Sequence, residues 1–266
     1  MNPKSTDQRH PRVVVIGGGY AGVLAANRLQ RRADVTLINP RAAFVERIRL
    51  HQLVTGSSTA TQDYADVLGT AVRLVVDAAR HIDAASRTVH LDSGAALDYD
   101  YLIYAVGSTG AIPEGAPGAS EFAYPLAELE QAQRLHARLA DVPPGAPVVV
   151  VGGGLTGIEA AAEFAEAGRA VTLVCGQLAP SLAASGRRSV TRKLTALGVD
   201  VVAARVAAVS ADAVTLDDGR VLVGGGCPDG ACTTCVDGSD GCPCDAGGGC
   251  NAGLSCLAGR CAMPRR

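Results

Sequence analysis

The chain has 266 residues, an apolar fraction of 48% and a formal net charge of -2. This length allows two domains of ordinary size, each able to bury a core. The small charge, and the lack of basic clusters before Arg265 and Arg266, exclude a nucleic-acid-binding role. The polar segment from Met1 to His10 does not match a signal peptide, and no stretch of about twenty apolar residues predicts a membrane span. We therefore expect a cytoplasmic protein, and peripheral contact with the inner face of a membrane stays open.

A glycine-rich loop, residues 17–22, follows the first predicted strand, Val13 to Ile16, and opens a helix. In such a loop Gly17 permits a tight turn, Gly19 admits a pyrophosphate and Gly22 lets the helix pack closely on the strand. The next strand ends at Asn39, where an acidic residue usually binds a ribose diol, and the Asn39 amide offers a donor and an acceptor instead. The predicted nucleotide contacts are Gly17, Gly19, Tyr20, Ala21, Gly22 and Asn39.

An arginine-rich stretch, residues 41–52, comes next, followed by short strands near 71–76 and 88–91 and a buried strand from Tyr101 to Ala105. A proline- and glycine-rich segment, residues 112–118, is typical of a linker. A helix is expected at 126–140, from the helical spacing of its leucines.

The glycine pattern then repeats after the strand Val148 to Val151, as Gly152-Gly153-Gly154-Leu155-Thr156-Gly157. A helix to about residue 167 and a strand ending at Cys175 follow, and alternating strands between 199 and 216 match the form of the first half. The predicted contacts of this copy are Gly152, Gly154, Leu155, Thr156, Gly157 and Cys175, although a thiol is a poor ribose ligand. Arg187 and Arg188 follow too far along the chain to indicate whether they reach a 2′-phosphate, so NADH and NADPH both stay open.

Together with the stretch 97–108, these motifs resemble the two-dinucleotide flavoprotein oxidoreductases, and within them the type II NADH dehydrogenase and apoptosis-inducing-factor-like branch. The resemblance implies an α/β fold of two Rossmann-like domains, with FAD at the first loop and NAD(P)H at the second. It also implies that Ala105 and Gly107 lie under the flavin nucleotide and that Arg49 faces the flavin or the acceptor. Glu159 matches a catalytic glutamate linked to proton transfer, and the equal alternative is a solvated glutamate in the first turn of the helix, where it favours the helix dipole.

The resemblance implies transfer of hydride from NAD(P)H to flavin and of electrons to a quinone-like acceptor. No cysteine lies in residues 1–174, so a redox-active disulfide beside the flavin is excluded. The alternatives are a dinucleotide-binding or redox-sensing protein without turnover, and an inactive truncated relative.

From Gly224 the composition changes to glycine and cysteine, where the family continues with a third flavin-binding segment. A disulfide-stapled module, a zinc knuckle, a [2Fe-2S] site and an unstructured tail are the alternatives for its eight cysteines, and no metal ligand is assigned. The expected organisation is an incomplete FAD domain (11–118), a linker helix (119–145), an NAD(P)H domain (146–223) and the tail (224–266).

Overall fold

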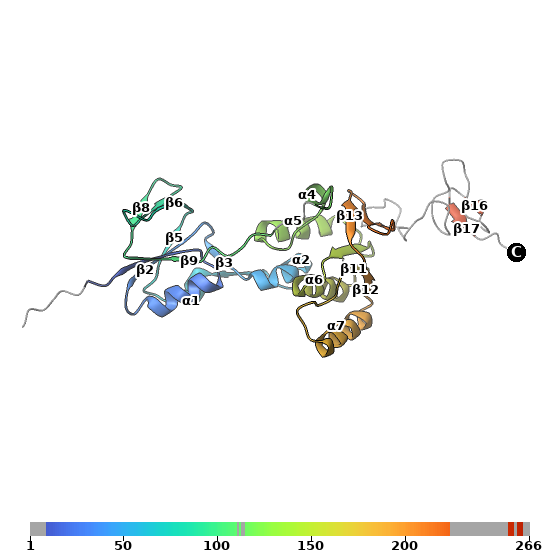
Figure 1. The fold of residues 1–266 in the computed structure, drawn as a ribbon, viewed down its shortest axis with the longest axis horizontal. Coiled ribbons are helices and arrows are strands. Elements are labelled where there is room, and N and C mark those ends of the chain that lie inside the picture. Colours follow the sequence, from blue (N-terminus) through green and yellow to red (C-terminus); the bar gives the residue numbers. More distant parts are fainter. Residues whose placement is uncertain (1–8, 111, 113–114, 224–254, 258–259, 263–266) are drawn as a thin grey trace, which may run out of the picture. The chain divides into compact units, whose positions relative to one another are not determined.

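The computed structural model describes residues 9–110, 112, 115–223 and the backbone at 255–257 and 260–262. The chain divides into two units (Figure 1): residues 1–47 with 60–109, and residues 48–59 with 110–266. Both are mixed α/β, as the sequence predicts. In the second, β16 (Ser255–Leu257) and β17 (Arg260–Ala262) form an antiparallel pair. The expected cysteine tail otherwise lies outside the described residues.

A parallel four-stranded sheet, in the order β5-β2-β1-β9, forms the centre of the first unit. Its strands are β1 (Arg12–Ile16), β2 (Asp34–Asn39), β5 (Arg73–Val76) and β9 (Tyr101–Tyr104). Because β1 is an apolar run, it buries side chains on both faces of the sheet. Val13 and Val15 pack with α1 (Tyr20–Leu29), while Val14 and Ile16 pack with Val89 of an antiparallel meander. The meander consists of β6 (Ala79–Asp83), β7 (Thr88–Leu91) and β8 (Ala96–Asp98).

Strands β3 (Ala43–Val45) and β4 (Thr61–Asp63) form an antiparallel pair, and β4 leads into the short helix α3 (Tyr64–Val67). The sequence did not predict these elements, because three- and four-residue segments carry too little periodicity. They place the buried rings of Phe44 and Tyr64 next to α1, with centroids 6.4 Å apart.

The second unit repeats this plan. Its parallel sheet has the order β10-β11-β12, formed by β10 (Val148–Val151), β11 (Val171–Cys175) and β12 (Asp200–Ala203). Helix α6 (Leu155–Glu166) packs on β10 and β11. The meander β13 (Val206–Val209), β14 (Ala213–Leu216) and β15 (Val221–Val223) shares a core with Val174 and Val202. Helix α7 (Ala184–Ala196) connects β11 to β12.

Three further helices belong to the second unit: α2 (Leu50–Thr55), α4 (Ala119–Phe122) and α5 (Leu129–Ala140). Helix α5 begins three residues later than the leucine spacing predicts. Arg169 donates hydrogen bonds to the carbonyls of Leu139 (2.9 Å) and Pro143 (2.8 Å), and so satisfies the C-terminal end of α5. Helix α2 contacts α5 and α6 through a buried face. The arginine-rich stretch, expected in the first nucleotide half, thus contributes its helix to the second unit.

Candidate dinucleotide-binding sites

The first glycine loop connects β1 to α1 with the geometry that the fingerprint predicts. Gly17 has a φ of +104°, a conformation that favours glycine, and its N–H donates to the Ile38 carbonyl at 2.9 Å. A Cβ on Gly22 would collide with the carbonyl of Gly17, so this glycine lets α1 approach the turn. A Cβ on Gly19, in contrast, would meet no atom within 4 Å. Gly19 therefore presents open backbone at the start of α1, where no side chain caps the helix.

The middle glycine of the loop, Gly18, is held by two side chains and is not among the nucleotide contacts that the sequence predicts. Its N–H donates to the Asn39 side-chain oxygen at 3.0 Å, and its carbonyl accepts from the Tyr64 hydroxyl at 2.8 Å. The Asn39 side-chain nitrogen donates to the Arg41 carbonyl at 2.8 Å. Asn39 therefore holds the loop from the end of β2, whereas the sequence predicted only a ribose contact for this residue.

Tyr64 is buried, with only 3% of the residue exposed, and this burial raises the pKa of its hydroxyl to about 12. The nearby positive charge of Arg41 opposes the shift without reversing it. The hydroxyl is consequently a neutral donor to Gly18 at every physiological pH.

The return segment after β9 packs against the first turn. The Ala105 N–H donates to the Ile16 carbonyl at 2.8 Å, and a Cβ on Gly17 would collide with the Ala105 carbonyl. Gly107 has a φ of +76° and is exposed. The Arg47 guanidinium donates to the Ser108 carbonyl at 2.6 Å and fixes the end of this segment. Arg47 was not predicted as a site residue, because an arginine in a basic stretch carries no sequence signal for a backbone contact.

The second glycine loop repeats the first. Gly152 has a φ of +120° and donates to the Val174 carbonyl at 2.9 Å, and a Cβ on Gly157 would collide with the Gly152 carbonyl. A Cβ on Gly154 would meet no atom within 4 Å, and no side chain caps α6. The exposed residues Leu155 and Thr156 form the first turn of α6. This loop thus offers a second open helix start.

Cys175 corresponds to Asn39 of the first unit. Each residue directly follows the one whose carbonyl accepts a hydrogen bond from the first glycine of the loop. Cys175 is 6% exposed, and its side chain lies against the middle glycine, Gly153, where an added Cβ would be 3.0 Å from the sulfur. Gly153 also accepts a hydrogen bond from the Ala179 N–H at 2.7 Å. Burial raises the pKa of the Cys175 thiol, which is therefore neutral near pH 7.

The two charged residues of the prediction lie in the second unit. Glu159 is exposed on the second turn of α6, and Arg49 is exposed immediately before α2. One helical turn after Glu159, the Glu163 carboxylate accepts hydrogen bonds from Thr55 at 2.9 Å and Ser57 at 2.5 Å. Glu163 therefore joins the segment 48–59 to α6, a contact that sequence spacing does not reveal.

Two loops of this construction, each between a parallel strand and a helix, have the form of the sites that a two-dinucleotide protein requires. The family model of pyridine nucleotide-disulphide oxidoreductases matches residues 11–231. The chain belongs to this family. The match covers both glycine loops and both meanders, so the family assignment and the duplicated fold rest on the same residues.

Relatives come from the branch that the sequence resembles. An NADH dehydrogenase-like protein of Mycobacterium tuberculosis (strain ATCC 25618 / H37Rv) is 37% identical over 168 residues, covering 58% of this chain and 42% of the relative. A type II NADH:quinone oxidoreductase of Staphylococcus haemolyticus is 27% identical and covers 60% and 44%. The chain thus spans about half the length, or less, of these relatives.

Solved structures agree on the fold. A structure of NDH2 from Plasmodium falciparum in complex with NADH has a TM-score of 0.66 at 21% identity, covering 78% of this chain and 51% of the other. An NAD-dependent persulfide reductase from A. fulgidus has a TM-score of 0.68 at 27% identity, covering 79% and 44%. Within the described residues, no helix has the length and apolar character to cross a membrane.

Proposed function

We propose that the protein is an FAD-dependent NAD(P)H oxidoreductase that passes electrons to a quinone-like acceptor. One observation carries the proposal: two independent glycine loops each leave an open backbone position, Gly19 and Gly154, at an uncapped helix start. A protein that binds a single dinucleotide needs only one such site.

The first loop is suited to the diphosphate of FAD. Gly19 leaves space for the pyrophosphate, and the helix start supplies N–H groups and a positive dipole end. Asn39 and Tyr64 hold Gly18 rigidly behind this surface, so that the loop is preorganised. The return segment, from Ala105 to Gly107, would run beneath the nucleotide. When bound, FAD supplies the acceptor for hydride and the donor of electrons.

The second loop would hold NAD(P)H in the same manner, with its pyrophosphate at Gly154 and the start of α6. Glu159, on the second turn of this helix, is the residue that we assign to proton handling near the nicotinamide. Glu159 is exposed, whereas the Glu163 carboxylate is bonded to Thr55 and Ser57, so Glu159 is the one of the two that a bound nucleotide would be able to reach. Arg49 is assigned to the flavin or the acceptor by the family resemblance.

The acceptor is assigned as a quinone because the relatives include a named NADH:quinone oxidoreductase. The proposal includes peripheral contact with the inner face of a membrane, where a quinone would be reached. The domain limits at residues 118, 145 and 223 belong to the same proposal.

The test is the visible absorption spectrum of the purified protein, with and without added FAD, followed by addition of NADH or NADPH and then of a soluble quinone. We expect a flavin doublet that bleaches with the reduced nucleotide and recovers with the quinone. A protein that retains no flavin even with excess FAD would show that the proposal fails, and nucleotide binding without flavin would favour the non-catalytic alternative.

A further inference from the structure

The adenosine end of the second site differs from the arrangement that selects NADH. Selection for NADH normally uses a carboxylate at the end of the second strand, which accepts hydrogen bonds from the ribose diol and repels a 2′-phosphate. In the second unit this position is Cys175, whose buried thiol packs on Gly153. It carries no charge to repel a phosphate.

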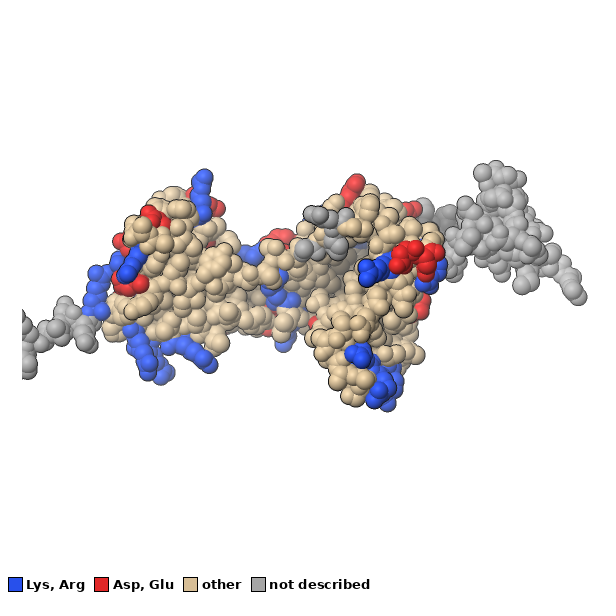
Figure 2. All heavy atoms as spheres, viewed as in Figure 1, with Lys and Arg blue, Asp and Glu red and all other residues tan. Residues whose placement is uncertain are grey.

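No acidic side chain between β11 and the end of α7 replaces the missing carboxylate. Residues 171–196, from β11 through α7, contain no aspartate or glutamate and four basic residues: Arg187, Arg188, Arg192 and Lys193. Basic side chains accordingly lie over α7 in Figure 2. The electrostatic balance of this crossover therefore favours a ligand with additional negative charge.

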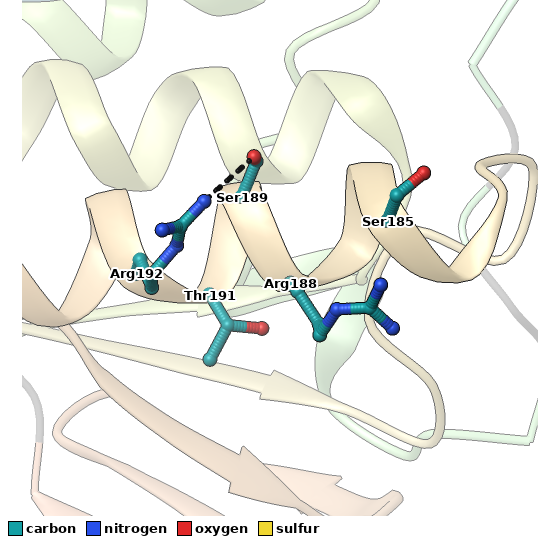
Figure 3. A pocket seen from close by; sticks show the side chains of 5 residues that line it. All are labelled: Ser185, Arg188, Ser189, Thr191 and Arg192. Atoms are coloured by element: carbon teal, nitrogen blue, oxygen red, sulfur yellow. Dashed lines mark hydrogen bonds between the residues drawn. The ribbon is translucent and has the colours of Figure 1, made fainter.

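Helix α7, which connects β11 to β12, places part of this positive charge near the edge of the sheet where the glycine loop lies. Because β11 and β12 are parallel, α7 begins near the carboxyl ends of the strands, the edge where the glycine loop also lies. The Arg187 guanidinium is committed to the Leu182 carbonyl at 2.6 Å. Arg188 is exposed within the second turn of α7 and lines a groove with Ser185, Ser189, Thr191 and Arg192 (Figure 3).

Arg192 is partly engaged, since its guanidinium donates to Ser189 at 3.3 Å (Figure 3). Lys193 pairs with Glu166 at 3.2 Å. Arg188 is therefore the basic residue of α7 that is both near the start of the helix and exposed to a ligand.

We propose that the second site accepts NADPH at least as well as NADH, because Cys175 removes the charge that would exclude a 2′-phosphate and Arg188 attracts it. This rests on the proposed function, which assigns NAD(P)H to that site. Cys175 is a specificity-determining residue here. It contributes because it lacks the negative charge of a carboxylate, and not because it bonds to the ligand.

The test compares ADP-ribose with 2′-phospho-ADP-ribose, which differ only in the 2′-phosphate and cannot reduce a flavin. Each is titrated calorimetrically into the full chain in the presence of saturating FAD, at low and at moderate salt. We expect the phosphorylated ligand to bind with equal or higher affinity, and with the steeper salt dependence. Any reproducible preference for ADP-ribose at low salt would overturn the proposal, while binding of neither ligand would remove the proposed NAD(P)H site as well.

Variants locate the effect. Cys175→Glu should shift the affinity ratio toward ADP-ribose by about tenfold or more, because a carboxylate binds the diol and repels the phosphate. Cys175→Ser, a neutral variant of similar size, should leave the ratio unchanged. An unchanged ratio in a folded Cys175→Glu protein would contradict the assignment of Cys175.

A surface variant keeps the proposal testable if Cys175→Glu does not fold. Arg188→Gln should weaken 2′-phospho-ADP-ribose several-fold and leave ADP-ribose unaffected. The matched control is Arg138→Gln, an exposed arginine near the end of α5. Equal effects of the two arginine variants would indicate a loss of general charge only, and would overturn the role of Arg188.

Discussion

At the scale of single residues, the glycines of each loop divide into two kinds that the sequence motif does not separate. Gly18 and Gly153 are buried and have no room for a side chain. Gly19 and Gly154 are exposed and have open space around the missing side chain. The first pair holds the loop in shape, and under the proposed function the second pair would face the ligand.

A matched pair of substitutions separates these roles. Gly18→Ala should lower the free energy of unfolding by about 1–3 kcal/mol, because the new methyl group overlaps the Tyr64 hydroxyl and the Asn39 side chain. Gly19→Ala should leave stability nearly unchanged, since its backbone is extended and its surroundings are open, yet weaken FAD retention. Thermal unfolding and the ratio of flavin to protein after gel filtration measure the two effects. Equal destabilisation by both variants would contradict this division.

The Tyr64 hydroxyl makes the stability of the native protein depend on pH. Tyr64→Phe leaves the Gly18 carbonyl without its donor, and should cost about 1 kcal/mol at pH 7. The folded-state pKa of Tyr64 is raised from 10.0 to about 12, so below pH 10 the hydroxyl is protonated in both states. Between pH 10 and 12 only the unfolded state ionises, which lowers the stability of the native protein.

The stability difference between the wild-type chain and Tyr64→Phe should therefore shrink as pH rises above 10, while other titrating groups affect both proteins alike. Urea unfolding at a series of pH values measures it. A difference that stays constant from pH 7 to pH 11 would argue against a buried Tyr64 hydroxyl.

At the scale of elements, α2 shows how a short helix is stabilised by contacts with residues distant in the sequence. Leu50, Leu53 and Val54 are buried, and the Val54 carbonyl lies 3.0 Å from the His136 ring nitrogen Nδ1 on α5. Glu163 of α6 then binds Thr55 and Ser57 through a single carboxylate oxygen. Six residues of helix would not be stable alone, so this packing maintains α2.

Glu163→Ala should consequently increase amide hydrogen exchange across residues 50–57. The control is Glu159→Ala, which removes a carboxylate from the same helix one turn earlier. It should leave exchange in α2 unaltered and, under the proposed function, reduce the rate of NAD(P)H oxidation. If Glu159→Ala loosens α2 as much as Glu163→Ala does, the hydrogen bonds to Glu163 are not what holds the segment.

The central elements could be predicted because their signals are local: valine-rich strands, glycine turns and alanine-rich helices follow one another in both halves. Helix α7 was missed, since Leu194 is its only buried residue in the described structure and its apolar periodicity is correspondingly weak. The hydrogen bonds that hold the first loop and α2 in place could not be predicted either. Tyr64 reaches Gly18 across 46 residues of sequence and Glu163 reaches Thr55 across 108, and no pattern in one sequence specifies such pairings.

At the scale of the whole molecule, the repeated plan predicts that each unit responds to its own ligand. Both units combine a parallel sheet, a helix on the glycine loop and an antiparallel meander. Their sheets differ at one edge: β1 pairs with β2 and β9, whereas β10 pairs with β11 alone among the described strands. A Cβ on Gly17 consequently meets the backbone of Ala105, while one on Gly152 meets nothing within 4 Å. The second loop has less support than the first.

Ligand-dependent hydrogen exchange on the full chain tests this difference. In the absence of ligands, amides of residues 152–157 should exchange faster than those of 17–22, because fewer neighbours oppose local opening of the second loop. FAD should slow exchange in the first loop, and 2′-phospho-ADP-ribose added to the FAD-saturated protein should slow exchange at 152–157 and 176–179. A ligand present at 100 times its Kd stabilises its own site by about 2.7 kcal/mol, enough to slow exchange by roughly a hundredfold where opening exposes that site. Equal protection of both loops by either ligand would mean that the two sites do not discriminate between nucleotides, and that the duplicated loops have not acquired the separate roles that an electron-transferring pair requires.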